Sequence, residues 1–121
     1  MTIYADHILD HYHNPRHRGT LPDATHTSAG LNASCGDQLS FALRVTDATV
    51  AAVCWQGAGC AISQAAASLL ADYITGKSVT VLATMDKDAM LQLLAIPLSA
   101  ARIQCGLLAL ETAQKALRDG V

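Results

Sequence analysis

The four cysteines are the residues of this sequence with the clearest chemical potential; they are Cys35, Cys54, Cys60 and Cys105. Cys35 stands in a Ser-Cys-Gly-Asp run. There Gly36 permits a turn that aims the Cys35 thiol and the Asp37 carboxylate at one point. A thiolate and a carboxylate held together suit a divalent metal. The alternative is a thiol at a strand edge beside an ordinary turn aspartate.

Two further cysteines occur where helices are expected to begin. Cys60 follows Gly57-Ala-Gly59 and is the first residue of a predicted helix. The N-terminus of a helix carries a partial positive charge, which favours the thiolate form of a cysteine there. Cys105 lies in the first turns of the final predicted helix, next to its apolar stripe. For both residues, burial as a small hydrophobic side chain is the alternative.

The spacing of the cysteines excludes the common two-cysteine motifs. The sequence contains no Cys-x-x-Cys pair, which argues against thioredoxin-type redox sites and zinc ribbons. Three thiolates, from Cys35, Cys60 and Cys105, together with the Asp37 carboxylate would complete a tetrahedral metal site. Cys54 lies between Val and Trp in an apolar stretch, so we expect it to be a packing residue of a strand.

All five histidines lie in the first quarter of the chain: His7, His11, His13, His17 and His26. A hydrolase with a cysteine nucleophile and a histidine base is chemically reasonable, but the sequence has no signature of such an enzyme. We expect the histidines to lie on a solvated or partner-facing surface. Replacing His11 or His13 should therefore leave metal binding intact.

Composition narrows the class of protein. The 121 residues suit one domain, and charged residues are only 15%, below the ~25% of an average soluble protein. The net charge of −2 argues against a nucleic-acid-binding surface. The N-terminus has no apolar signal region, so we expect a cytoplasmic protein whose thiols stay reduced. The uncharged stretch 48–71 is interrupted by its glycine loop, which argues against a membrane span.

Strands and helices must position these side chains, and their expected order along the chain predicts an α+β fold. In this fold a small three-stranded antiparallel sheet packs against several helices. The predicted strands are Leu39–Val45, Val50–Gln56 and a shorter one over Ala29–Ser34, after a loop over Arg16–Ala29. The predicted helices are Tyr4–His13, Cys60–Ile74, Ser78–Ala83, Asp86–Leu94 and a long C-terminal helix over Ser99–Arg118. We expect a single domain over 1–121, with 1–28 as a mobile N-terminal helix and loop.

Four motifs, in this order, resemble the IscU/SufU/NifU-N family of iron–sulfur cluster assembly scaffolds. They are Tyr4…Ile8-Leu-Asp-His-Tyr-His-Asn-Pro-Arg16…Gly19, Asn32-Ala-Ser-Cys-Gly-Asp37, Gly57-Ala-Gly-Cys-Ala-Ile-Ser-Gln-Ala65 and Arg102-Ile-Gln-Cys105. Together they span nearly the whole chain and are highly specific.

The resemblance implies that Cys35, Cys60 and Cys105 bind a cluster or zinc, with Asp37 as a fourth ligand or a group that helps a cluster leave. Cys54 matches no ligand of the family. The implied protein is a non-enzymatic scaffold that accepts sulfur from a cysteine desulfurase, binds iron, builds a transient [2Fe–2S] cluster and passes it to apo-proteins. Iron–sulfur clusters are held by cysteine thiolates, which fits the residues present.

Two departures from the IscU branch change what is expected. Gln104 stands directly before the last cysteine, where that branch has histidine. The chaperone-binding LPPVK motif is absent, and Leu94-Ala-Ile-Pro-Leu98 stands in its place. The resemblance therefore gives no basis for expecting chaperone docking, and the four-ligand set is nearer the SufU branch, although the Cys60–Cys105 spacing lacks the SufU insertion.

The second hypothesis is a zinc-dependent sulfurtransferase like the SufU branch. Zinc would bind at Cys35, Asp37, Cys60 and Cys105, and docking with the desulfurase would free one thiolate to accept a persulfide sulfur. Cys105 is the residue that we expect to accept it.

Overall fold

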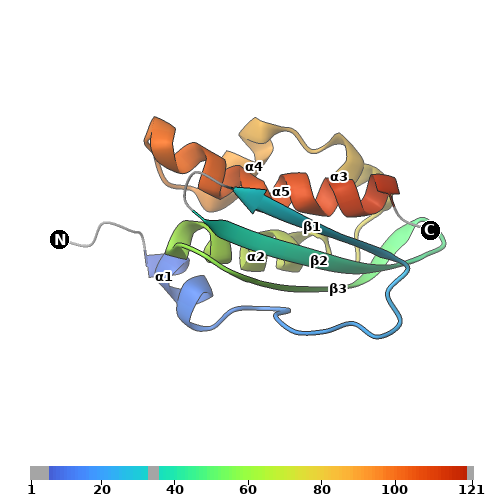
Figure 1. Cartoon of the computed structure of the whole chain (residues 1–121). Helices are drawn as coiled ribbons and strands as arrows, with labels where there is room; N and C mark the ends of the chain where they lie inside the picture. The colour runs from blue at the N-terminus through green and yellow to red at the C-terminus, as the bar shows by residue number, and fades with distance from the viewer. Residues whose placement is uncertain (1–5, 33–35, 120–121) are drawn as a thin grey trace.

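The computed structural model describes residues 6–32 and 36–119 of the chain. Its elements are α1 (Asp6–His13), β1 (His26–Asn32), β2 (Asp37–Thr46), β3 (Thr49–Ala58), α2 (Ala61–Ile74), α3 (Val79–Thr84), α4 (Lys87–Leu94) and α5 (Ala100–Asp119). Helices and strands are segregated along the chain, and the long C-terminal helix is the last element (Figure 1). The predicted α+β class is confirmed.

The sheet is antiparallel in the order β1-β2-β3. A two-residue loop joins β2 to β3, and both of its residues have positive φ, 52° at Asp47 and 60° at Ala48. That pattern defines a type I′ turn, whose twist matches the twist of the two strands. β1 pairs with β2 from His26 opposite Leu43 to Asn32 opposite Asp37. Thus β1 ends where β2 begins, at one end of the sheet.

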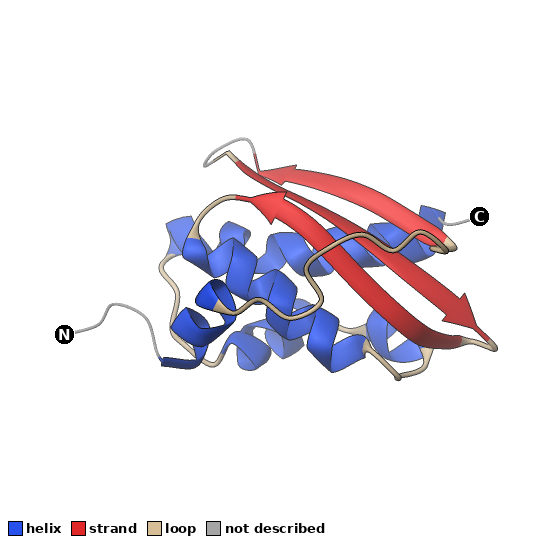
Figure 2. Ribbon diagram, turned by 90° about the horizontal axis from the view of Figure 1, so that it is seen from below, coloured by secondary structure: helices blue, strands red, loops and turns tan. Residues whose placement is uncertain are grey.

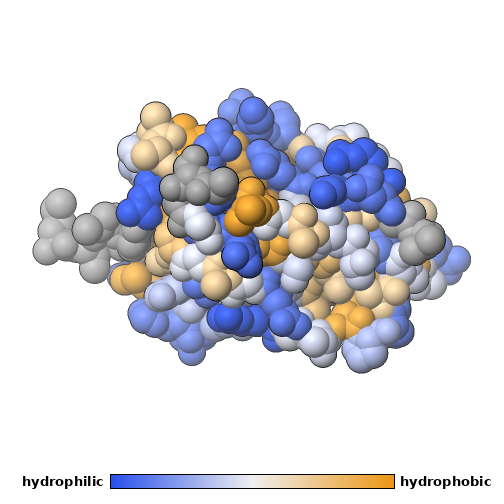
Figure 3. Space-filling model, in the orientation of Figure 1, coloured by the Kyte–Doolittle hydropathy of each residue, from blue (hydrophilic) through white to orange (hydrophobic). Residues whose placement is uncertain are grey.

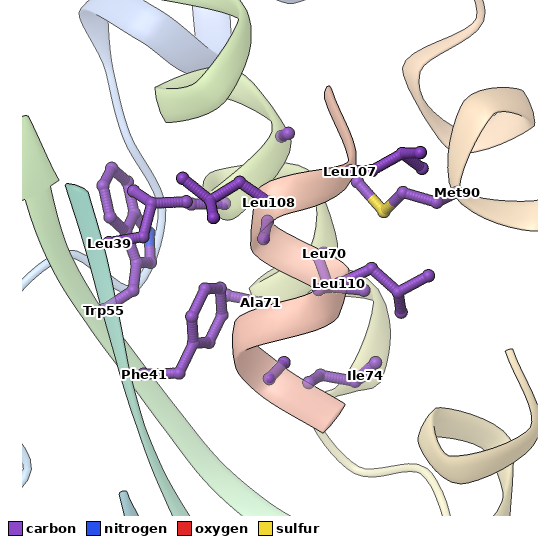
Figure 4. Packing of buried hydrophobic residues seen from close by; sticks show 14 of the residues in the cluster. Leu39, Phe41, Trp55, Leu70, Ala71, Ile74, Met90, Leu107, Leu108 and Leu110 are labelled. Carbon is purple, nitrogen blue, oxygen red and sulfur yellow. The ribbon is translucent and has the colours of Figure 1, made fainter. Parts of the chain in front are cut away.

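One face of the sheet carries the core. Side chains alternate along a strand, so Leu39, Phe41 and Leu43 of β2 all point to the same face and are almost completely buried. The helices lie on that face (Figure 2). Leu39, Phe41 and Trp55 reach from the sheet toward side chains of α2 and α5, with Met90 of α4 beyond (Figure 4).

Alanines let α2 and α5 pack closely behind the sheet. The fully buried alanines of these two helices are Ala65, Ala66, Ala67, Ala71, Ala109, Ala113 and Ala116. Such small side chains allow helix backbones to approach each other and the sheet, since little volume lies between them.

The opposite face of the sheet is open. Leu31 is 63% exposed there, and apolar side chains on the face seen in Figure 3 are scattered among polar ones. Cys54, opposite Ala42 in the register, lies on this face and is half-buried. The prediction that Cys54 belongs to a strand is confirmed, but its side chain is not part of the core behind the sheet.

The segment before β1 differs from the prediction. The predicted loop over Arg16–Ala29 ends early, because β1 begins at His26 and pairs residue by residue with β2. The predicted strand over Ala29–Ser34 overlaps β1, and its predicted end at Ser34 lies outside the described residues. The residues of β1 are polar and small, so no hydrophobic alternation marks where the strand begins. The neighbouring β2 supplies the hydrogen-bonding partners that decide its conformation.

Helix α1 is anchored by two histidines. His7 Nε2 lies 2.5 Å from the carbonyl oxygen of Leu94, at the end of α4. His11 Nδ1 lies 2.7 Å from the Ser68 hydroxyl of α2, and Ser68 Oγ also accepts the backbone N–H of Arg16. His11 is buried, so the expectation of a solvated surface position is wrong for that residue. Burial lowers the pKa of His11 below its usual value of 6.5.

Within residues 6–32 and 36–119, every helix is either too short or too polar to span a lipid bilayer. Part of the uncharged stretch 48–71 forms strand β3, and part forms helix α2. The predicted glycine loop is shorter than expected, because β3 continues to Ala58 and only Gly59 and Cys60 link it to α2.

Candidate metal centre

Asp37 is a completely buried carboxylate at the first position of β2. A turn at Gly36, whose φ is 75°, precedes it, and Gly36 N–H donates to the carbonyl oxygen of Asn32 at 2.8 Å. The carboxylate faces the helix side of the sheet, as the alternation of β2 requires. Its Oδ1 accepts the backbone N–H of Cys60 at 2.9 Å. Burial of such a group is tolerated because it is hydrogen-bonded.

Cys60 is the N-cap residue of α2 and follows the end of β3. Its Sγ lies 3.9 Å from Asp37 Oδ2, within donating distance of a thiol. This approach depends on Gly59, whose φ is 150°: a Cβ there would lie 2.3 Å from Asp37 Oδ1. Only glycine leaves room for the carboxylate beside the loop.

Cys105 approaches from the third direction, on α5. It is buried, with 2% of its surface exposed, and its Sγ lies 4.0 Å from Nδ2 of Asn32 on β1. An amide N–H near a sulfur stabilises thiolate character. Gln104, the preceding residue, is exposed.

The structure thus brings together three of the four side chains singled out from the sequence. Asp37, Cys60 and Cys105 each offer a ligand atom, and these atoms lie within 4.8 Å of one another. Two thiols and one carboxylate form a donor set that suits zinc or iron. Cys35 lies outside the described residues. Cys54 lies apart, within the body of β3 on the open face of the sheet.

Sequence reasoning gave no role to one residue of the site. Ser63 is fully buried on α2, and its Oγ lies 3.8 Å from Cys60 Sγ while donating to the Cys60 carbonyl oxygen at 3.1 Å. Its position three residues after the N-cap was the available signal, because that position faces back over the helix start.

Comparison with known proteins decides the family of this chain. The family model of the NifU-like N terminal domain matches residues 3–119. The chain belongs to this family. The IscU/SufU/NifU-N resemblance found in the sequence motifs is therefore confirmed.

Two relatives with stated roles represent both branches of the NifU-like N-terminal domain family. The chain is 39% identical over 87 residues to the iron-sulfur cluster assembly scaffold protein IscU of Thermotoga maritima. It is 35% identical over 86 residues to the zinc-dependent sulfurtransferase SufU of Bacillus subtilis. These matches cover 72% and 71% of this chain, and they span only 61% and 58% of the two relatives' own lengths.

A solved structure supports the fold. The N-terminal part of a nitrogen-fixing NifU-like protein from Brucella abortus superimposes with a TM-score of 0.81. The match covers 96% of this chain and 92% of that one at 22% identity. Similarity at this identity shows a shared arrangement of sheet and helices.

Proposed function

We propose that this chain is an iron–sulfur cluster assembly scaffold. The observation that carries the proposal is the convergence of Asp37, Cys60 and Cys105 within 4.8 Å at one end of the sheet. Sulfur would come from a cysteine desulfurase as a persulfide, and iron would join it at the same site. The resulting [2Fe–2S] cluster is cargo that apo-proteins receive.

The donor set supports transient rather than permanent binding. Thiolates hold iron–sulfur clusters, and we include Cys35 with Cys60 and Cys105 as cluster ligands. A carboxylate is a harder and weaker ligand for the cluster iron than a thiolate. Asp37 is therefore the group that we expect to let the cluster leave. A reducing compartment such as the cytoplasm would keep these thiols available.

Reconstitution tests the proposal. The purified chain would be incubated anaerobically with a cysteine desulfurase, cysteine and ferrous iron, and cluster formation followed by visible absorption and Mössbauer spectroscopy. Transfer to an apo-ferredoxin is the second readout. We expect Cys60→Ala and Cys105→Ala to abolish the cluster, whereas Cys54→Ala is the matched control that retains it. A cluster that survives both ligand substitutions contradicts the proposed site.

The role assigned to Asp37 has its own test. We expect Asp37→Ala to give a longer-lived cluster, because a weak ligand that promotes release is gone. Decay of the visible absorption after reconstitution measures the lifetime. A variant that loses its cluster faster than the unchanged protein contradicts this role.

The second candidate function is zinc-dependent sulfur transfer, favoured by the similarity to the Bacillus subtilis sulfurtransferase and by the same donor set. A thiolate of this chain, with Cys105 as our candidate, would attack the outer sulfur of the desulfurase persulfide. The S–S bond would break, and the desulfurase thiolate would leave.

Metal content separates the two functions. Tightly bound zinc that is essential for stimulating a desulfurase supports sulfur transfer. A zinc-free chain that assembles and donates a cluster supports the scaffold.

A further inference from the structure

The segment over residues 57–59, which ends β3 and leads into Cys60, is held from the outside by two polar side chains; we call it the glycine loop. Arg18 Nη2 donates to the carbonyl oxygen of Gly57 at 3.0 Å, and Arg18 Nη1 donates to Gln64 Oε1 at 3.3 Å. Gln64 Nε2 in turn donates to the carbonyl oxygen of Gly59 at 2.9 Å. Arg18 and Gln64 thus hold residues 57–59, in which Gly57 and Ala58 end β3 and Gly59 follows it; we refer to this pair as the loop clamp.

The loop clamp is preorganised by the edge of β3. The backbone N–H of Trp55 donates to the carbonyl oxygen of His17 at 3.0 Å, and that of Gly19 donates to the carbonyl oxygen of Trp55 at 2.9 Å. The Arg18 guanidinium lies 5.3 Å from the centre of the Trp55 ring, a cation–π arrangement. The backbone on both sides of Arg18 is therefore held against β3, and the Trp55 ring orients the guanidinium toward the glycine loop.

The inner side of the same loop carries the metal-site contact. Gly59 passes Asp37 without a side chain, and the next N–H, that of Cys60, donates to Asp37 Oδ1. A shift of the loop would move this N–H and the Cys60 thiol together, because both belong to one residue. The outer carbonyls and the inner N–H belong to the same short piece of backbone.

We propose that Arg18 and Gln64 are positioning residues for Cys60. Neither touches the thiol; they fix the loop so that the Cys60 N–H stays on Asp37 and the thiol stays beside the carboxylate. The effect on bound metal rests on the proposed function, whereas the effect on the loop does not. Through the loop clamp, the segment preceding β1 influences a site whose donors, among the described residues, lie on β2, at the start of α2 and on α5.

Amide exchange in the metal-free 121-residue chain tests the positioning directly. The Cys60 amide reports its own hydrogen bond to Asp37. In Arg18→Gln and in Gln64→Ala we expect this amide to exchange roughly threefold to tenfold faster, the range for one lost hydrogen bond. The exchange rate of the Cys60 amide in Arg18→Lys should lie between the rates in these variants and in the unchanged chain. A lysine ammonium lacks the planar pair of N–H donors with which the guanidinium contacts two oxygens.

Arg44→Gln is the matched control. Arg44 also makes a surface contact, an ion pair with Asp23 at 2.7 Å, but it does not touch the loop. Loss of this ion pair should leave the exchange rate of the Cys60 amide unchanged.

Salt gives a further check of the loop clamp. The partners of Arg18 in the loop clamp are neutral oxygens, so protection of the Cys60 amide should persist in high salt, which screens ion pairs.

Release of zinc to a chromogenic chelator tests the consequence for the site. We expect both loop-clamp variants to release zinc several-fold faster than Arg44→Gln and the unchanged chain. Faster Cys60 exchange in a chain that retains no zinc and no cluster would keep the positioning role and refute the proposed function. Unchanged Cys60 exchange in both variants, or an unprotected Cys60 amide in the unchanged chain, would overturn the positioning role.

Discussion

The two ends of the sheet are built differently. At the turn end, where β2 passes into β3, backbone groups satisfy one another: Val50 N–H donates to the carbonyl oxygen of Lys77, Gly76 N–H to that of Val50, and Val79 N–H to that of Ala48. At the site end, side chains close the structure, since a buried carboxylate accepts the N–H of Cys60 and an amide lies near the thiol of Cys105.

This difference shows where the fold depends on individual residues. Backbone-to-backbone contacts form with almost any side chain, so the turn end tolerates substitution as long as the backbone angles are allowed. The site end needs a particular carboxylate, glycine and pair of thiols. We expect substitutions there to change metal binding, and substitutions at the turn end to change only stability.

The largest expected contrast is between two glycines. Gly59→Ala would place a methyl group on Asp37 Oδ1, so we expect a loss of roughly 3 kcal/mol in the free energy of unfolding from overpacking and backbone strain. Zinc affinity should fall roughly 10–100-fold, as when a group that orients a metal ligand is lost. Denaturant unfolding and zinc titration measure the two effects.

Gly76→Ala is the control at the turn end. Gly76 has a φ of 85°, but a Cβ there meets no atom within 4 Å. We expect a loss of about 1 kcal/mol from the left-handed backbone and no change in zinc affinity. Equal effects of both substitutions on zinc binding would remove the distinction between the two ends.

A smaller difference between the two ends of the sheet is expected in their stability at low pH. Because the folded-state pKa of His11 lies below 6.5, the unfolded chain binds a proton first, and stability falls as the pH drops below about 6.5. We expect the loss of protection to begin in α1 and the neighbouring site end, since His11 joins α1 to Ser68, while amides of the Thr46–Thr49 turn remain protected.

Comparison of two histidine variants checks the origin of this effect. His11→Gln should flatten the decline in stability between neutral pH and the onset of carboxylate titration. His13→Gln, an exposed position of the same helix, should leave the decline unchanged. If both variants behave alike, His11 does not couple α1 to acid.

The smallest expected effect is a gain at the turn end. Ala48 adopts a φ of 60°, which glycine reaches without the strain of a Cβ. We expect Ala48→Gly to raise the free energy of unfolding by about 1 kcal/mol, with unchanged zinc affinity. Thermal unfolding provides the measurement; a destabilised variant would show that the turn is not strained.

Many of the elements that build the two ends of the sheet could be predicted from the sequence. The strand predicted over Leu39–Val45 lies within β2, where Leu39, Phe41 and Leu43 alternate toward the core. The helix predicted over Asp86–Leu94 is α4, and the Asp86 side chain caps it by accepting the N–H of Ala89 at 2.8 Å. Both signals are local, since each involves residues only a few positions apart in the sequence. The convergence of Asp37 with two thiols was inferred from residue types, and the structure places three of the four side chains together.

The missed features depend on distant partners. The third strand was predicted, but its first residues, 26–28, were assigned to a loop and are extended because β2 lies beside them; His11 is buried because Ser68 of α2 faces it. The loop clamp joins Arg18 to a loop near Gly57, and no periodicity in either segment predicts that contact. Sequence patterns indicate which face of an element is buried, whereas the choice of partner emerges only when the elements assemble.

The origin of the three donors in β2, the start of α2 and α5 has a consequence for protein synthesis. The chain emerges from the ribosome N-terminus first, so the Cys105 thiol appears well after Asp37 and Cys60 have been made. A nascent chain that stops before α5 has neither this thiol nor the helix that packs on β1 and β2. We therefore expect metal loading to follow the synthesis of α5, so that a nascent chain without this helix does not sequester iron or zinc.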